Sequence, residues 1–205
     1  MSLSLPASNA IEALTPSQMD FLKALPKAEL HAHLNGSIPL SVLQQLAKEY
    51  VPSEADSDLS HSVIQSGVEK LQNGIVLKDI HDFFPLFPAI YALTSTKETL
   101  ARATGAVLAE FLEPGDGEDY PQATYLELRS TPRETAAMTR LEYMETVLDE
   151  VEKYRPDQAA FIVSLDRRMT KEAASECVEA AVSLKKRGRR VVGFDLCGHP
   201  TVSGS

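Results

Sequence analysis

The stretch Glu29-Leu30-His31-Ala32-His33-Leu34-Asn35-Gly36-Ser37 closes the first apolar, β-favouring run of the chain and leads through a turn toward a helix. Residues two apart on a strand point to the same face, so the imidazoles of His31 and His33 can reach one ion. Neutral imidazole suits zinc or a similar divalent metal, and a catalytic zinc site takes about three protein ligands, so later strands must supply others. A structural pair of histidines without a metal is the alternative, because this spacing alone is a weak signal.

Four short apolar runs, each followed by polar or turn-forming residues, predict β-strands. They are Ala28–Leu34, Ala123–Leu128, Ala159–Leu165 and Arg190–Leu196. Between them, apolar residues recur every three or four positions, which predicts helices with one buried face. This alternation favours right-handed βαβ crossovers and a mostly parallel sheet. Both a doubly wound sheet and a (β/α) barrel have this order of elements.

Capping signals predict where the helices begin and end. The expected N-caps are Thr15, Ser95, Thr139 and Thr170, with Glu98 and Glu142 completing two capping boxes. Gly188 follows a basic last turn and supplies the left-handed end of the last helix. The serine-, aspartate- and glutamine-rich stretch Val51–Asp79 predicts a loop with one short helix, and Glu113–Gln122 predicts a second loop.

The composition limits the classes of function. The chain has 205 residues, 43% of them hydrophobic, and 20 basic against 29 acidic side chains, which gives a formal net charge of -9. This charge disfavours nucleic acid as a partner, and any anionic ligand must be small and must be met by local arginines. No run is long enough for a membrane span and the start lacks a secretory signal, so we expect a cytoplasmic protein without a membrane partner. Cys177 and Cys197 are expected to be reduced, with Cys177 in the core.

Polar side chains follow all four predicted strands at their carboxyl ends. They are His31 and His33, Arg129 to Arg133, Asp166, and Asp195 to His199. The carboxyl ends of parallel strands meet on one face, which in a (β/α) barrel is the active face. The pattern therefore favours a barrel with an enzyme-like mouth.

Four segments resemble the adenosine deaminase family, and specifically its branch that acts on N6-methyl-AMP. They are LPKAELHAHLNGS at 25–37, YLELRSTPR at 125–133, SLDR at 164–167 and VVGFDLCGHP at 191–200. The resemblance implies a (β/α)8 TIM barrel of the metal-dependent hydrolase type with one Zn²⁺ on its carboxyl face. It also implies hydrolytic removal of the 6-amino or 6-methylamino group of a small purine nucleoside or nucleotide.

The resemblance implies roles for individual residues. His31 and His33 would bind the metal. Asp195 would have a structural role, positioning the residues that contact the metal or the substrate. Arg133 would hold a phosphate, because its planar fork can grip two oxygens. The implied substrate-binding residues are His33, Asn35, Tyr91, Ser130, Thr131, Pro132, Arg133, Asp166 and Gly198.

Two departures from the family accompany the resemblance. Cys197-Gly198-His199-Pro200 stands where the family reads SGDP, so a histidine replaces an aspartate. The family's later segments carry a third zinc histidine, a proton-shuttling glutamate and a zinc-binding aspartate, and they do not occur here, so we expect the general acid beyond Ser205. A (β/α)8 barrel typically takes about 250 residues. We therefore expect 1–205 to be one domain truncated after about four βα units, with unpaired outer strands and 1–24 as an N-terminal helical extension.

Three functions remain open. The chain is the N-terminal half of a purine aminohydrolase, or part of another metal-dependent hydrolase of the same barrel group. Alternatively, it is a catalytically inactive fragment that acts as a binding or regulatory partner. The STPR and GFDLCG segments favour the first hypothesis over the second. Two histidines without a carboxylic acid predict weak zinc binding and no turnover by this chain alone, and its oligomeric state stays open.

Overall fold

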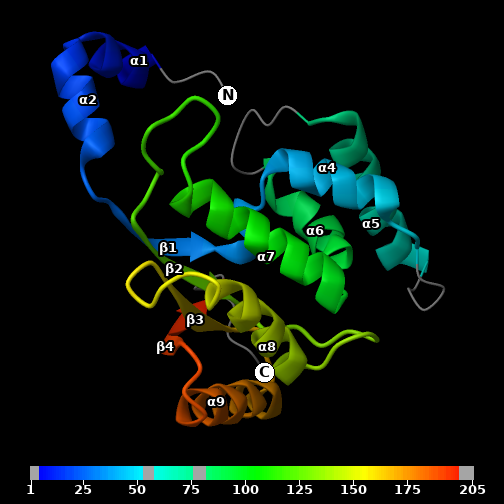
Figure 1. The fold of residues 1–205 in the computed structure, drawn as a ribbon. Helices are drawn as coiled ribbons and strands as arrows, with labels where there is room; N and C mark the ends of the chain where they lie inside the picture. Colours follow the sequence, from blue (N-terminus) through cyan, green and yellow to red (C-terminus); the bar gives the residue numbers. More distant parts are fainter. Residues whose placement is uncertain (1–4, 53–57, 76–81, 199–205) are drawn as a thin grey trace.

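The centre of the molecule is a sheet of four parallel strands in the order β1-β2-β3-β4. The computed structural model describes residues 5–52, 58–75 and 82–198 (Figure 1). The strands are β1 (Ala28–His33), β2 (Tyr125–Ser130), β3 (Ala159–Asp166) and β4 (Val191–Cys197). Each strand pairs with its neighbour in sequence, as successive βα units of a barrel do. The predicted strands are confirmed, with ends that differ from the prediction by at most two residues.

The two faces of the sheet differ because side chains alternate along each strand. Leu128, Phe161 and Val163 are fully buried in the core between the sheet and the helices. The opposite face of the same strands carries polar residues, among them Arg129 and Ser164. The apolar core therefore lies on the helix side, and the face that forms the interior of a barrel is polar near the strand ends.

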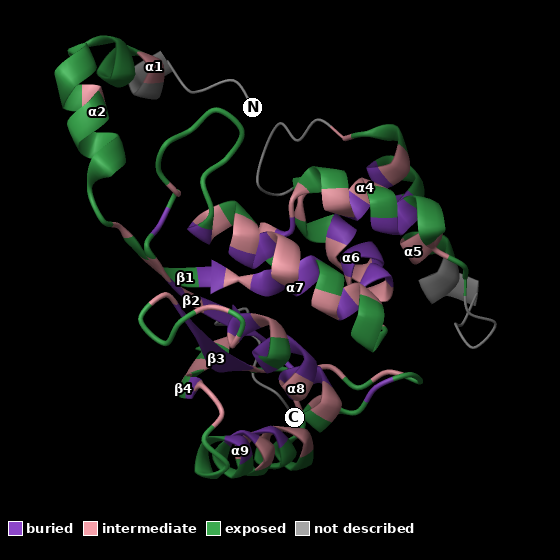
Figure 2. Ribbon diagram, in the orientation of Figure 1, coloured by how far each residue is buried: buried purple, intermediate pink, exposed green. Residues whose placement is uncertain are grey.

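Helices cover the outer side of the sheet (Figure 1). Three of them pack against neighbouring strands: α7 (Lys97–Leu112) on β2, α8 (Arg140–Val151) on β3, and α9 (Lys171–Lys186) on β3 and β4. Shorter elements connect β1 to α7 and include α3 (Leu34–Ser37), α4 (Leu40–Glu49), η2 (Phe84–Leu86) and α6 (Phe87–Leu93). Burial is concentrated where these helices face the sheet and one another (Figure 2).

The first cap of α7 differs from the prediction. Thr96, not Ser95, is the N-cap, and its hydroxyl accepts a hydrogen bond from the Thr99 N–H. Thr99 takes the place predicted for Glu98, which lies in the first turn and still complements the helix dipole. Two adjacent hydroxyl residues made both starts possible, and the Ser95 carbonyl instead accepts a bond of 2.8 Å from the Thr135 hydroxyl. The other predicted caps are confirmed at Thr15, Thr139, Thr170 and Gly188.

The stretch predicted as a loop contains a long helix, α5 (Asp58–Asn73), of 16 residues. Val68 and Leu71 on this helix are buried in the core, and Gly67 lies against α6 so closely that a Cβ there would be 2.6 Å from the Ala89 Cβ. The prediction of one short helix is wrong, because polar residues on the solvent face hid a narrow apolar stripe. The flanking residues 53–57 and 76–79 lie outside the described parts of the chain.

Two helices precede the sheet, α1 (Leu5–Glu12) and α2 (Pro16–Ala24), and they lie apart from the other helices (Figures 1 and 2). α2 buries none of its residues. The Lys27 ammonium donates to the carbonyl oxygens of Leu22, Lys23 and Leu25 at 2.9–3.2 Å, which complements the negative end of α2. None of the helices in the described ranges is long and apolar enough to cross a membrane.

Both outer strands have a free edge within the described residues, because β1 pairs only with β2 and β4 only with β3. Val192, Phe194 and Leu196 on β4 are 45%, 47% and 55% exposed. They alternate with the residues that face the barrel interior, so they form the uncovered outer face of the edge strand. The described residues thus show the unpaired edges that the sequence predicts.

Candidate functional site

The carboxyl ends of the four strands lie at one edge of the sheet. The strands end at His33, Ser130, Asp166 and Cys197. Parallel pairing aligns these ends, with His33 opposite Arg129 and Asp166 opposite Cys197. The polar residues that follow each strand in the sequence are therefore brought to a common face, where the active sites of (β/α) barrels lie.

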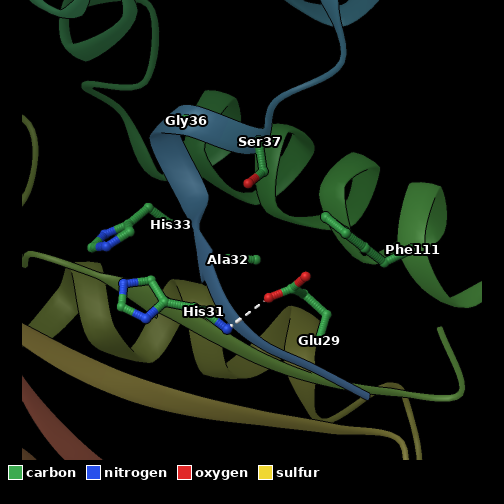
Figure 3. A pocket seen from close by; sticks show the side chains of 7 residues that line it. All are labelled: Glu29, His31, Ala32, His33, Gly36, Ser37 and Phe111. Carbon is green, nitrogen blue, oxygen red and sulfur yellow. Dashed lines mark hydrogen bonds between the residues drawn. The ribbon is translucent and has the colours of Figure 1, made fainter. Parts of the chain in front are cut away.

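The two histidines of β1 lie side by side. Their ring centroids are 5.3 Å apart, and both imidazoles lie on the same side of the strand (Figure 3). Glu29 points to the other side, where Ser37 and Phe111 also lie (Figure 3). The Glu29 carboxylate accepts a hydrogen bond of 2.7 Å from the His31 backbone N–H. The common face predicted for His31 and His33 is what the structure shows.

The surroundings of His33 favour its neutral form. Burial lowers the pKa of the His33 imidazole below its usual value, and the charges of His31 and Arg129 lower this pKa further, against the opposing carboxylate of Asp195. His33 is therefore neutral at physiological pH. Neutral imidazole is the form that binds a divalent metal.

The described residues supply only part of a metal-binding donor set. His31 and His33 offer two nitrogen donors on one face of β1. Within the described ranges, no group of three or more His, Cys, Asp or Glu side chains could hold a metal ion. Because catalytic zinc takes about three protein ligands, the histidine pair fits a metal only as a partial donor set.

A buried ion pair lies beneath the histidines. The Arg129 guanidinium lies 3.3 Å from the Asp195 carboxylate, joining β2 to β4 across the intervening strand. Ser164 on that strand donates to the same carboxylate at 3.0 Å, and Arg129 also donates to the Leu30 carbonyl oxygen of β1. The Arg129 Nε is buried and has no partner among the described residues. The network ties all four strands together directly below the mouth.

A second polar network anchors the turn after β1. The Ser130 and Tyr143 hydroxyls are 2.7 Å apart, and the Ser130 hydroxyl also donates to the side-chain oxygen Oδ1 of Asn35 at 3.5 Å. The Asn35 amide donates to the Thr94 hydroxyl at 3.3 Å. Complete burial raises the pKa of Tyr143 to about 12, so its phenol stays protonated and can act as a hydrogen-bond donor. Asn35 and Ser130 are thus fixed in position by bonds within the protein.

Arg133 stacks on an aromatic ring at the mouth. Its guanidinium carbon lies over the Tyr91 ring, 3.6 Å from the ring centroid, which is a cation–π contact. Arg133 is partly buried, and no residue in the described part of the chain accepts a hydrogen bond from it. Burial raises the pKa of Tyr91, so the ring carries no charge that would neutralise the arginine. The arginine is held in place while its N–H donors remain available.

The Asp166 carboxylate forms an ion pair with the nearby Arg168. The carboxylate accepts bonds of 2.9 Å and 2.7 Å from the Arg168 guanidinium and one of 2.8 Å from the Arg168 backbone N–H. These side-chain bonds hold the pKa of Asp166 below its usual value, although burial opposes them. Gly198 packs against this carboxylate with a φ of +99°, and a Cβ there would lie 3.0 Å from Asp166 Oδ1. Both its backbone angle and the close approach require glycine.

The rest of the predicted site lies next to these groups. The Thr131 hydroxyl is 3.5 Å from the Cys197 sulfur, and this contact links the ends of β2 and β4. Pro132, the next residue in the chain, is buried. Arg168 also lies at the mouth, and it is not among the site residues predicted from the sequence. Its position two residues after Asp166 allows a local ion pair, and this spacing is the one signal that could have identified it. His199 and Pro200 lie outside the described residues.

Comparison with known proteins identifies relatives over most of the chain. The sequence matches the family profile described as adenosine deaminase over residues 26–205. It is 34% identical over 190 residues to N6-Methyl-AMP deaminase-L of Xenopus laevis, covering 90% of this chain and 50% of the relative. It is 33% identical over 199 residues to N6-methyl-AMP deaminase of Homo sapiens, covering 93% and 51%. The chain thus spans about half the length of the curated relatives that it matches.

Solved structures show the same relationship. Arabidopsis ADAL complexed with IMP superposes with a TM-score of 0.66 at 33% identity, covering 90% of this chain and 53% of the other. The apo N6-methyl-AMP deaminase of Arabidopsis thaliana gives a TM-score of 0.67 at 30% identity, covering 90% and 52%. The sheet and helices described above therefore correspond to about half of each of these chains.

Proposed function

The chain belongs to the adenosine deaminase family, and from this premise we propose that it forms the nucleotide-binding side of an aminohydrolase active site. The reaction breaks the C6–N bond of a 6-amino- or 6-methylaminopurine 5′-monophosphate with water. It yields the 6-oxopurine nucleotide and ammonia or methylamine. The relatives named N6-methyl-AMP deaminase and the IMP complex of Arabidopsis ADAL support this choice of substrate class.

The observation that carries the proposal is the free guanidinium of Arg133. Its stacking on Tyr91 fixes its position, and its donors make no hydrogen bond to the described residues. A planar guanidinium binds two phosphate oxygens in one geometry, and such charge-assisted bonds are roughly twice as strong as neutral ones. A neutral nucleoside offers no group that needs this charge. The arginine therefore favours a 5′-monophosphate.

His31 and His33 would supply two ligands to a zinc ion, and further ligands would come from outside the described residues. A divalent metal at such a site supplies Lewis acidity. The neutral state of His33 suits this role. Asp195 would act on His33 through charge without contacting substrate, because it lies in the network beneath the mouth.

The remaining site residues would position the nucleotide. Asn35 lies in a hydrogen-bonded network near His33 and would face the purine. Asp166 and Gly198 would line the ribose side, where the small glycine leaves room for the carboxylate. The residues at the phosphate end would be Ser130, Thr131, Pro132 and Arg133, beside Tyr91.

Replacing Arg133 tests the proposal. We expect AMP to bind this chain more tightly than adenosine, and Arg133→Ala to weaken AMP binding by about tenfold or more, because a charge-assisted contact is lost. Adenosine affinity should stay unchanged, since the nucleoside has no phosphate. Isothermal titration calorimetry with both ligands measures the two effects.

The control is Arg133→Lys, which keeps the charge but loses the planar fork and much of the ring stacking. We expect it to retain part of the preference for AMP. Equal losses of AMP and adenosine affinity in Arg133→Ala would contradict a phosphate-binding role and, with it, the proposed nucleotide substrate.

A further inference from the structure

The Arg168 guanidinium lies within electrostatic range of the same two side chains as Arg133, Tyr91 and Asp166. It is paired with Asp166 through Nε at 2.9 Å and Nη2 at 2.7 Å. Both arginines also act on Tyr91 and on Asp166, since each lowers the pKa of both groups. The two guanidiniums therefore lie within electrostatic range of one phenol and one carboxylate.

Arg168 keeps hydrogen-bond donors free despite this pair. Asp166 engages Nε and Nη2, and no residue in the described ranges accepts a hydrogen bond from Nη1. The Arg168 side chain is 66% exposed, so these donors reach the solvent at the mouth. The ion pair fixes the orientation of the fork and leaves its outer edge available to a ligand.

The local charge balance favours an anion. Arg133 and Arg168 carry two positive charges against the single negative charge of Asp166, because Tyr91 stays neutral. The chain as a whole has a formal net charge of -9, which repels anions. A cluster with a positive balance on such a chain marks the place where a small dianion can bind.

The Asp166–Arg168 pair fixes the direction of the Arg168 fork. Three bonds from Arg168 to one carboxylate hold this side chain in a single orientation. The Asp166 side chain is 18% exposed, whereas that of Arg168 is 66% exposed. The carboxylate therefore lies on the protein side of the pair, and the guanidinium lies on the solvent side, where a ligand can reach it.

We propose that Arg168 is a second phosphate-binding arginine, which Asp166 holds in place beside Arg133 and Tyr91. The site then selects the dianionic phosphate of a purine 5′-monophosphate through two guanidiniums approaching from β2 and β3. This inference rests on the proposed function and names a specificity-determining residue for it. Asp166 is a positioning residue for Arg168 in addition to its place on the ribose side.

The chain contains a matched control for this arginine. Arg155 and Asp157 form a pair of the same kind, also two residues apart, with Nε and Nη2 each 2.9 Å from the carboxylate. This pair precedes β3, at the opposite end of the strand from Asp166. Its side chains are 71% and 70% exposed. Arg155→Gln therefore removes the same net charge and the same type of contact away from the mouth.

The test compares the affinities of the chain for AMP, inorganic phosphate and adenosine by isothermal titration calorimetry. We expect Arg168→Gln to weaken AMP and phosphate by about tenfold, because one charge-assisted contact is lost. Adenosine affinity should not change. Arg155→Gln should leave all three affinities unchanged. Arg168→Lys keeps the charge without the fork, and we expect an intermediate loss for AMP.

Each outcome decides the inference. If Arg168→Gln and Arg168→Lys bind AMP as the wild type does while Arg133→Ala does not, the second arginine is refuted and the proposed function stands. If Arg168→Gln weakens adenosine as much as AMP, Arg168 is structural and the inference is also refuted. If the wild type binds adenosine as tightly as AMP, the proposed nucleotide specificity itself fails.

Discussion

The purified 205-residue chain is expected to release no ammonia from AMP and no methylamine from N6-methyl-AMP above the uncatalysed rate, with or without added zinc. His31 and His33 offer two donors, and no third ligand joins them within the described residues. A metal held by two imidazoles is bound weakly. Glu29, the carboxylate nearest to the pair in sequence, points to the other side of β1 (Figure 3). Glu29 is therefore not placed to act as the general acid, and general acid–base catalysis is worth roughly 10²–10⁴ in rate.

A coupled assay for ammonia and a chromatographic assay for the 6-oxopurine nucleotide measure this directly. The control is His31→Ala, which removes one of the two imidazoles. We expect this variant and the wild type to release the same background amount of product. Turnover that scales with purified chain and disappears in His31→Ala would contradict the account, because it would show that the described residues form a complete catalytic site.

The second large effect is expected at the ion pair beneath the histidines. Arg129→Met should lower the free energy of unfolding by about 3 kcal/mol, because it leaves the Asp195 carboxylate largely buried without its partner. The Arg129 side chain is 9% exposed and that of Asp195 18%, so water replaces little of the lost interaction. Urea denaturation followed by circular dichroism measures the change.

A double variant separates the pair from its surroundings. Arg129→Met with Asp195→Leu removes both charges, and we expect it to recover much of the lost stability. Arg155→Met, in an exposed ion pair, should cost at most about 1 kcal/mol. If Arg129→Met lowers the free energy of unfolding no more than Arg155→Met does, the Asp195 carboxylate does not need Arg129 as its partner in the folded state.

The strands could be predicted because their signal is local. β3 is buried along most of its length, and its run of apolar residues is bounded by polar ones. The length of α5 was underestimated because its signal is spread over turns of a helix. Val68 and Leu71 are buried among exposed polar residues, and the close contact of Gly67 with Ala89 joins segments separated in sequence. Such a contact has no counterpart in a local pattern. The start of α7 was misplaced by one residue because Ser95 and Thr96 are both good caps.

Some features of the candidate site could likewise be predicted from the sequence, and others could not. The common face of His31 and His33 follows from two-residue spacing on a strand, and the sequence predicts it. The stacking of Arg133 on Tyr91 joins a loop after β2 to α6, and the pairing of Arg129 with Asp195 joins β2 to β4. These contacts depend on how the elements pack. Sequence spacing therefore indicated which residues gather at the mouth, but not which side chains hold one another there.

A crystal structure of the chain grown with AMP locates the phosphate. We expect the phosphate within hydrogen-bond distance, about 3 Å, of both Arg133 and Arg168. We also expect the purine to extend toward His33 and Asn35, with Arg133 still stacked on Tyr91. A phosphate bound away from both arginines, or a purine in place of the phosphate beside Tyr91, would contradict this placement of the nucleotide.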